Sequence, residues 1–213
     1  ENVYWGKNFT DKEIEAEIEN FNSDNRFKVT FHDNIENTVA EAIADGKIVA
    51  RSKGRMEFGA RSLGNRSILS RADKVENIPI INDMIKNRDF WMPFAPSVLA
   101  ERSKDYYFKP KPMDSPFMIM SFDSRPETRN IYPAGQHAYD FTARPQEVDN
   151  KNNMDYYKLL KHYEEKTGEG IILNTSFNLH GFPIVYSPLD ALKVLDKSGL
   201  EHLALGNWLI EKR

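Results

Sequence analysis

The 213-residue sequence contains no cysteine, so disulfides, thiol nucleophiles and thiolate metal sites are all excluded. It also lacks a run of about 18 consecutive apolar residues, the length that a membrane-spanning helix needs. The first six residues show neither the basic start nor the apolar stretch of a secretion signal, and no initiator methionine is present. We therefore expect a cytoplasmic fragment of a longer protein, without a membrane partner.

An excess of positive charge is missing as well. The chain has 29 Lys and Arg against 32 Asp and Glu, which gives a net charge of -3. Since a general nucleic-acid-binding protein is usually basic, we expect no nucleic-acid partner. Hydrophobic residues make up 40% of the chain and charged residues of both signs 29%, which argues against global disorder. The length favours one core with a long excursion.

Helix signals and strand signals mix in the first half of the chain. Thr10 with Glu13, and Asp33 with Glu36, form capping patterns that predict the starts of two helices. The second predicted helix runs to about residue 44, before Gly46. Strands are predicted at 27–31, 47–50 and 67–70, a helical segment at 78–87 and an extended one at 90–99.

The second half adds a predicted strand at 116–121 and a polar, irregular surface excursion at 122–138. An amphipathic helix is predicted at 153–166 and a short buried strand at 171–173. Ser187, followed by Pro188, starts a helix that ends at Gly199, and a hairpin closes the chain around residues 206–207. Because strands and helices mix without strict alternation, the sequence predicts a single α/β or α+β sheet domain.

Residues 51–71 are the first candidate for chemistry. Six of them are basic and Glu57 is the only acidic one, and glycines stand at positions 54, 59 and 64. Glycine allows the backbone to approach a ligand closely, and arginine suits bidentate recognition of phosphate or carboxylate. The segment therefore favours phosphate binding, with a solvated turn whose arginines pair with surface acids as the alternative.

Two further segments carry weaker signals. Lys86 and Arg88 stand two apart in a segment predicted to be extended, so both could face one polyanion; solvated residues at a helix end are the alternative. Ser176 and Asn178 follow an apolar strand, where α/β sheets commonly bind ligands. An Asn- and Ser-rich turn that bonds its own backbone is the alternative there.

Other kinds of site find no support in the sequence. The five histidines show no metal-ligand spacing, and neither a Gly-x-Ser-x-Gly elbow nor a Walker lysine loop is present. No nucleophile has a neighbouring base in the sequence, which disfavours acyl-enzyme chemistry. The tyrosines at 156, 157 and 163 are interpreted as packing residues. We therefore expect no protein-held metal site.

The segment Gly54-Arg-Met-Glu-Phe-Gly-Ala-Arg-Ser-Leu-Gly-Asn-Arg-Ser-Ile-Leu69 closely resembles the signature of the NodU/CmcH-type O-carbamoyltransferases. The similarity spans nearly the whole chain: it continues through Pro93-Phe-Ala-Pro-Ser97, Thr142-Ala-Arg144-Pro-Gln146, residues 174–183, Ser187-Pro-Leu-Asp-Ala191 and Leu205-Gly-Asn207. The resemblance implies a YrdC-like fold, a twisted mixed sheet flanked by helices. It also implies a connector and helix over residues 1–25 and the C-terminal YrdC-like domain over 26–213.

What the resemblance implies for function is a two-stage reaction. Carbamoyl phosphate and ATP, with Mg²⁺, would form carbamoyl adenylate and release phosphate and pyrophosphate, and the carbamoyl group would then pass to a hydroxyl of a small molecule or glycan. It implies catalytic roles for Lys86, Arg88 and Arg66. It implies substrate or nucleotide binding by Arg55, Arg61, Asn65, Ser67, Arg144, Asn174, Ser176 and Asn178.

The chain departs from the family pattern at two places. Met92 stands where an arginine usually precedes Pro-Phe-Ala-Pro, and Ala138-Tyr-Asp140-Phe141 replaces the usual His-Val-Asp-Gly before Thr-Ala-Arg, although His137 lies one residue earlier. The family's larger N-terminal domain, which is the expected partner, is not part of this sequence, so transfer itself would need it. The alternatives are a free-standing YrdC-like nucleotide- or RNA-binding protein and an inactive docking domain.

Overall fold

The structure is a computed structural model that describes residues 2–86 and 94–213, with Lys86 described by its backbone alone. Its main feature is a mixed sheet of eight strands among these residues, in the order β1-β11-β10-β2-β3-β9-β4-β8. Neighbours are antiparallel except for the parallel pairs β10–β2 and β4–β8. The strands are β1 (Phe27–Phe31), β2 (Val49–Ser52), β3 (Arg66–Arg71), β4 (Ala95–Leu99), β8 (Gln146–Val148), β9 (Ile171–Ser176), β10 (His202–Leu205) and β11 (Trp208–Lys212).

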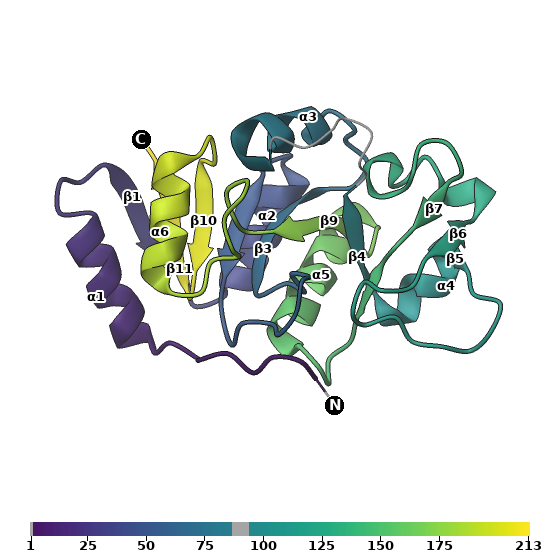
Figure 1. Cartoon of the computed structure of the whole chain (residues 1–213), viewed down its shortest axis with the longest axis horizontal. Coiled ribbons are helices and arrows are strands. Elements are labelled where there is room, and N and C mark those ends of the chain that lie inside the picture. The colour runs from purple at the N-terminus through teal and green to yellow at the C-terminus, as the bar shows by residue number, and fades with distance from the viewer. Residues whose placement is uncertain (1, 87–93) are drawn as a thin grey trace.

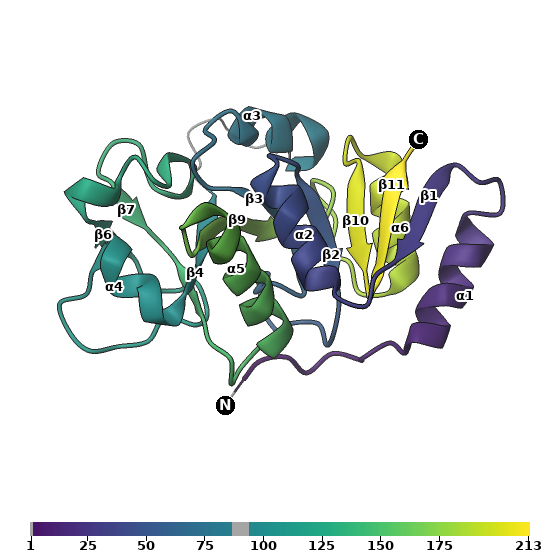
Figure 2. The ribbon, with the colours of Figure 1, turned by 180° about the vertical axis from the view of Figure 1, so that it is seen from behind.

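Helices cover both faces of this sheet (Figures 1 and 2). Helices α2 (Ile35–Ala44) and α5 (Met154–Thr167) pack together on one face, and α1 (Asp11–Phe21) and α6 (Pro188–Lys197) lie on the other. Helix α3 (Asn77–Ile81) continues into a π-helical turn, Asn82–Lys86. This arrangement confirms the predicted mixed sheet flanked by helices in a single domain.

The side chains of β9 alternate between two hydrophobic cores, one on each face of the sheet. Ile171 and Leu173 point into the core that contains Ile14 and Ile18 of α1, whereas Ile172 points into the core of α2 and α5. Successive side chains of a strand face opposite sides, so a strand with helices on both faces is apolar along its length. The connector helix α1 thus shares its core with the rest of the domain.

The helix starts follow the local sequence closely. Thr10 and Glu13 form the predicted capping box of α1, and Ser187 forms a second one with Asp190 at α6. The predicted cap at Asp33 is wrong by one residue, because the side chain of Asn34 accepts the hydrogen bond from Asn37 N–H instead.

Residues 100–148 differ most from expectation. The apolar segment 116–121 is not a strand, since buried Met118 adopts a left-handed backbone with φ 55°. Residues 122–138 are not a surface excursion, because Tyr132 and Ala134 are fully buried in the main core. Short elements fill the region: α4 (Ser103–Tyr106), the three-stranded sheet β5 (Tyr107–Phe108), β6 (Phe122–Ser124) and β7 (Thr142–Ala143), and 3-10 turns at Ala100–Arg102, Pro126–Thr128 and Pro133–Gly135.

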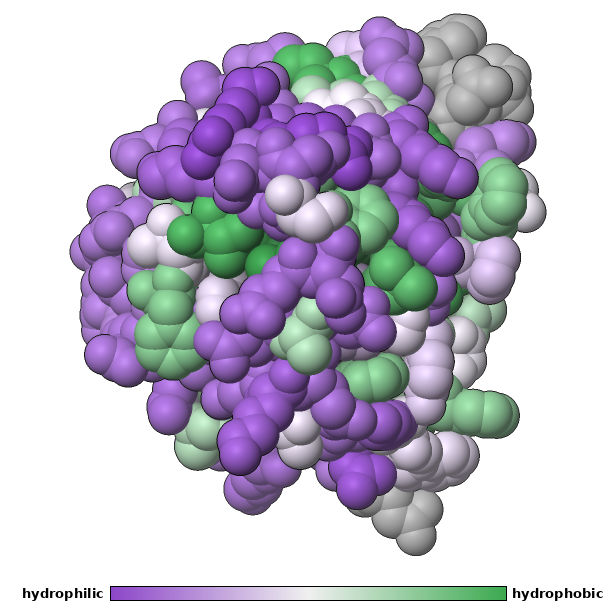
Figure 3. Space-filling view, turned by 90° about the vertical axis from the view of Figure 1, so that its left-hand side faces the viewer, coloured by the Kyte–Doolittle hydropathy of each residue, from purple (hydrophilic) through white to green (hydrophobic). Residues whose placement is uncertain are grey.

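The end of the molecule formed by α1, β1 and α6 is mainly hydrophilic, with smaller apolar areas between the polar side chains (Figure 3). Arg26 lies at this end and pairs with Asp24 at 2.5 Å and with Asp196 at 2.6 Å. Exposed ion pairs of this kind contribute little to stability. This end therefore offers control positions for experiments on the opposite part of the sheet.

Candidate functional site

The loop between β2 and β3, residues 53–65, carries the glycine- and arginine-rich segment. Its shape is held by Glu57, which is 4% exposed and whose Oε1 accepts hydrogen bonds from the N–H groups of Leu63 and Asn65 at 2.7 and 2.6 Å. A buried carboxylate that accepts several backbone hydrogen bonds fixes the loop strongly. The loop is therefore organised by the protein itself.

Arg66 belongs to this internal framework. Its side chain is buried, and its guanidinium donates to the carbonyl oxygens of Gly54 at 3.1 Å and of Tyr186 at 3.2 Å. Burial lowers the pKa of Arg66 to about 10, which still leaves the group charged at neutral pH. Arg66 is not among the residues that line the two cavities described below, unlike Arg61 and Arg144.

Asn65, the last residue of the loop, and Ser67 of β3 are also buried. Asn65 donates to the Arg55 carbonyl at 2.8 Å, and Ser67 Oγ accepts from Gly64 N–H at 3.0 Å. The Arg55 side chain is exposed and donates to the Gly6 carbonyl at 3.4 Å. In this structure these three residues shape the loop and its contact with the N-terminal segment.

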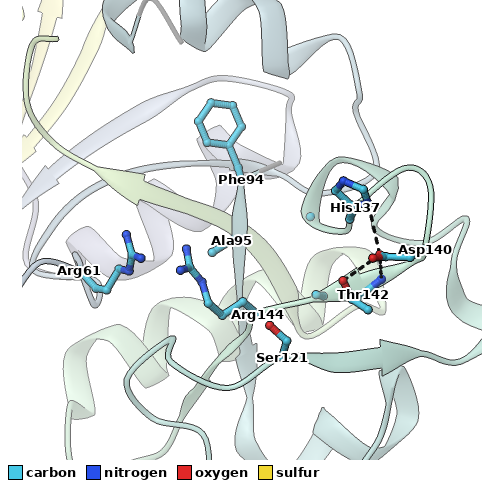
Figure 4. Close-up of a pocket in the computed structure, with 10 residues that line it drawn as sticks. Arg61, Phe94, Ala95, Ser121, His137, Asp140, Thr142 and Arg144 are labelled. Atoms are coloured by element: carbon cyan, nitrogen blue, oxygen red, sulfur yellow. Dashed lines mark hydrogen bonds and ion pairs between the residues drawn. The ribbon is translucent and has the colours of Figure 1, made fainter. Parts of the chain in front are cut away.

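Arg61 and Arg144 come together although they are far apart in the sequence. Both line a cavity of about 480 Å³ at the start of β4, beside Ala95 (Figure 4). Arg61 is exposed on the 53–65 loop, and Arg144 is half-buried between β7 and β8. Guanidinium groups that share one cavity form a site for phosphate or carboxylate. Arg61 and Arg144 are thus two cationic residues of the predicted site that line the same cavity.

A second, narrow cavity of about 70 Å³ adjoins the first and shares Arg61, Phe94, Ala95 and Arg144 with it. Residues 174–176 of strand β9 line this cavity, and Ser62 of the loop adds another polar residue. The sheet register explains this convergence, because Asn174 lies opposite Ala95, and Ser176 lies opposite Ser67 at the end of the loop. The two cavities therefore bring together four predicted site residues: Arg61, Arg144, Asn174 and Ser176.

The turn after β9 lies close to the other predicted cationic segment. Ser176 Oγ donates to Asn178 Oδ1 at 2.7 Å, and Asn178 Nδ2 donates to the Phe182 carbonyl at 2.8 Å. His180 N–H donates to the Ile85 carbonyl at 3.0 Å, directly before Lys86. Lys86 ends a π-helical turn rather than lying in an extended segment. The backbones of the two weaker segments thus meet. Arg88 and Met92 lie outside the described residues.

His137 and Asp140 line the larger cavity and were not among the predicted site residues. His137 Nδ1 lies 3.2 Å from Asp140 Oδ1, and this oxygen also accepts from the Thr142 N–H at 2.9 Å and its hydroxyl at 2.8 Å (Figure 4). The Thr142 N–H, then its hydroxyl, lowers the pKa of Asp140. The signal in the sequence was His137 itself, displaced by one residue from the family pattern.

Phe141 occupies the position of the glycine in the usual His-Val-Asp-Gly pattern, and it keeps a left-handed backbone, with φ 57°. Its N–H donates to the His137 carbonyl at 3.0 Å, and its ring lies 4.0 Å from the Arg129 guanidinium. Such a backbone in a bulky residue persists only when its surroundings hold it. In the turn before Arg144, Phe141 therefore has a left-handed backbone at the position where the family pattern has glycine.

Among the described residues, no cluster of three or more His, Asp or Glu side chains could hold a metal ion. Magnesium commonly binds through nucleotide phosphates and water with only one or two protein carboxylates. Over the same part of the chain, none of the helices combines the length and apolar character needed to cross a bilayer.

Comparison with protein-family models matches residues 40–212 to the carbamoyltransferase C-terminus. The chain is 37% identical over 213 residues to nodulation protein NolNO of Sinorhizobium fredii, covering 99% of this chain and 31% of that protein. It spans between 31% and 41% of the length of the first five curated relatives that it matches.

Two solved structures share the fold at low sequence identity. P. abyssi Sua5, complexed with L-threonine, aligns with a TM-score of 0.56 at 17% identity, covering 84% of this chain and 47% of that chain. Full-length HypF, in a phosphate- and nucleotide-bound form, aligns with a TM-score of 0.54 at 17% identity, covering 86% of this chain and 22% of that chain. These likenesses agree with the predicted YrdC-like sheet.

Proposed function

Since the chain belongs to the carbamoyltransferase family as its C-terminal domain, we propose that it binds ATP and carbamoyl phosphate and forms carbamoyl adenylate. The observation that carries this proposal is the convergence of Arg61 and Arg144 on two adjoining cavities that Asn174 and Ser176 also line. Two cations and two neutral polar groups in one pocket suit a small phosphorylated substrate.

The reaction requires two polyanions side by side. One water releases phosphate from carbamoyl phosphate and leaves carbamate. A carbamate oxygen then bonds to the α-phosphorus of ATP while the bond from that phosphorus to the pyrophosphate oxygen breaks, which gives carbamoyl adenylate and pyrophosphate. Guanidinium groups fixed before the substrates arrive stabilise negative charge that grows on the transferring oxygens. Because Glu57 and Arg66 hold the loop that carries Arg61, little reorganisation is needed during the reaction.

The roles proposed for Arg61, Arg144 and Ser176 follow their positions at the cavities, whereas those for Lys86 and Arg88 come from the resemblance to the family. Arg61 and Arg144 bind carbamoyl phosphate, Lys86 and Arg88 bind the ATP phosphates, and Ser176 with Asn178 orients the nucleotide phosphates and Mg²⁺. Magnesium would enter with the nucleotide and neutralise its charge. Arg66, Arg55, Asn65 and Ser67 act by positioning the loop, since the first, third and fourth are buried and the Arg55 side chain contacts the N-terminal segment.

Transfer of the carbamoyl group to a hydroxyl of a small molecule or glycan is assigned to the longer protein. The chain covers 31% of NolNO, whose name connects it to nodulation. We propose that residues 1–25 connect to an N-terminal domain that receives the adenylate, that residues 26–213 form the adenylating domain, and that the enzyme works in the cytoplasm.

Calorimetric titration of the 213-residue chain with carbamoyl phosphate, in the presence of a non-hydrolysable ATP analogue and Mg²⁺, tests the proposal. Arg61→Gln should weaken carbamoyl phosphate binding about 10- to 100-fold, since a hydrogen bond to a charged group contributes about 1.5–3 kcal/mol. Arg26→Gln, at the far end of the sheet, is the matched control and should bind like wild type. Equal affinity in wild type and Arg61→Gln would contradict the assigned site.

A further inference from the structure

A buried amide oxygen at the narrow cavity has no partner. Asn174 lines this cavity, its side chain is 1% exposed, and its Oδ1 accepts no hydrogen bond from any described residue. A buried acceptor without a donor is costly, and such groups are uncommon in native proteins. An acceptor left open beside a ligand cavity therefore points to a donor on the ligand.

The orientation of this amide is fixed by its other end. The two hydrogens of Asn174 Nδ2 are shared among three acceptors, of which the Ser62 carbonyl lies at 3.3 Å and Gln146 Oε1 at 3.2 Å. Nδ2 also lies 3.0 Å from Ser97 Oγ, which accepts from it because the single hydroxyl proton of Ser97 goes to Gln146 Oε1 at 2.8 Å. A flipped amide would set Oδ1 against two other carbonyl oxygens, so the open group is an acceptor.

The amide rests on a buried support. Gln146 and Ser97 are 2% and 0% exposed, and Gln146 Nε2 donates to the Leu63 carbonyl at 2.9 Å, which ties the network to the 53–65 loop. A satisfied polar network of this kind holds its members in one geometry. Asn174 is therefore held rigidly while its Oδ1 stays open.

The narrow cavity that Asn174 lines combines charge with a small apolar wall. Arg61 and Arg144 supply the cations, whereas Ala95, Phe94 and Met118 supply apolar surface. A carbamoyl group is compact and neutral, with a carbonyl acceptor and an NH₂ donor. The cations suit its phosphate and carbonyl oxygens, which leaves the NH₂ group in need of an acceptor.

We propose that Asn174 Oδ1 accepts a hydrogen bond from the NH₂ group of carbamoyl phosphate and thereby selects carbamoyl over other acyl phosphates. This inference rests on the proposed function. Acetyl phosphate has the same shape but carries a methyl group in place of NH₂, so it leaves the oxygen unpaired. A site built around a hydrogen bond rejects an analogue that lacks the donor far more strongly than one that differs only in size.

The test compares carbamoyl phosphate and acetyl phosphate by calorimetry on the 213-residue chain with the ATP analogue present. Wild type should bind carbamoyl phosphate at least tenfold more tightly. Asn174→Leu should reduce the ratio to within threefold, mainly by weakening carbamoyl phosphate. Asn207→Leu is the matched control, because Asn207 also has a buried unpaired Oδ1 but lies in the β10–β11 turn, and it should keep the wild-type ratio.

Equal binding of both compounds by wild type would overturn the inference, even if Asn174→Leu did not fold. The inference would also be overturned if Asn174→Leu folded and kept the wild-type ratio of the two affinities. Circular dichroism and thermal melting check that the variant is folded. If wild type bound neither compound, the proposed function itself would fail, and the inference with it. If wild type bound both compounds equally and Arg61→Gln weakened that binding, the proposed function would stand and only the role of Asn174 would be removed.

Discussion

At the scale of single residues, the most informative position is Phe141. Its left-handed backbone, φ 57°, stands where the family pattern has glycine. A non-glycine residue in this conformation costs roughly 1–2 kcal/mol. The contact between the Arg129 guanidinium and the Phe141 ring stabilises the folded state by about 0.5–1 kcal/mol and so offsets part of this cost. The turn that presents His137 and Arg144 to the cavity therefore stores backbone strain.

This strain can be measured by comparing Phe141→Gly with Phe141→Ala in urea unfolding. Both variants lose the ring, but glycine alone relieves the backbone, so Phe141→Gly should be more stable by about 1 kcal/mol. Tyr139, which is 89% exposed and has an ordinary φ, is the control. There alanine should be at least as stable as glycine. An alanine variant at 141 as stable as the glycine variant would show that the turn is unstrained.

At the scale of elements, helix α1 illustrates local control. The Lys7 ammonium, 2.5 Å from Glu13, and then the Thr10 N–H lower the pKa of Glu13 to about 2 from an ordinary 4.5. A carboxyl whose folded pKa is depressed stabilises the folded state above its unfolded pKa and loses that contribution as pH falls. The capping box should therefore weaken between pH 4.5 and 2.

Urea unfolding of wild type and Glu13→Gln at pH 7 and pH 3 tests this expectation. The variant should be less stable at pH 7. The difference should shrink at pH 3, because there the unfolded Glu13 carboxyl has bound a proton that the folded one, with its pKa of about 2, still largely lacks. Glu15→Gln, on the exposed side of the same helix, should show no such convergence. A constant difference between wild type and Glu13→Gln would mean that the charge does not contribute.

Elements with a local signal were predictable and those without one were not. Thr10 and Ser187 mark helix starts because their side chains bond N–H groups three residues away. The segment 116–121 is apolar enough for a strand but is not one, with Met118 turned to φ 55° beside the narrow cavity. Tyr132 is buried by contacts with Tyr106 and Tyr107 that no local pattern of the sequence reveals.

The candidate site shows the same limit. Its cationic segments were identifiable from composition, and two of the predicted cations, Arg61 and Arg144, line one cavity. The burial of Arg66 was not predictable, because it depends on the Tyr186 carbonyl, 120 residues away, closing over the guanidinium. The sequence shows that an arginine is present, but only the fold determines whether its guanidinium lines a cavity, as in Arg61, or bonds backbone carbonyls, as in Arg66.

At the scale of the whole molecule, the N-terminal segment and the 53–65 loop form one unit. Gly6 N–H donates to the Met56 carbonyl at 3.0 Å, and Phe58 N–H donates to the Val3 carbonyl at 2.7 Å. Tyr4 Oη donates to the Leu63 carbonyl at 2.9 Å, and burial raises the pKa of this tyrosine. The residues before α1 therefore support the loop that carries Arg61.

Tyr4→Phe should lower the free energy of unfolding by about 0.5–1.5 kcal/mol, the usual contribution of one hydrogen bond. It should also speed amide exchange at Leu63 and Asn65, whose N–H groups make the two shortest backbone hydrogen bonds to Glu57. Hydrogen exchange followed by mass spectrometry measures both sites. Tyr139→Phe, on an exposed tyrosine, should change neither quantity. Unchanged exchange in Tyr4→Phe would show that the loop is independent of the N-terminal segment.

The pairing of β3 with β9 has a further consequence. Ser67 lies opposite Ser176, and the alternation of β9 sets Asn174 and Ser176 on one side and Thr175 on the other. Inserting or deleting one residue within this strand would exchange the two sides and put Leu173 or Thr175 in the place of the Asn174 amide. Insertions and deletions should thus be tolerated in the loops between strands but selected against within β9. An alignment of related chains should therefore show gaps in the loops and none in this strand.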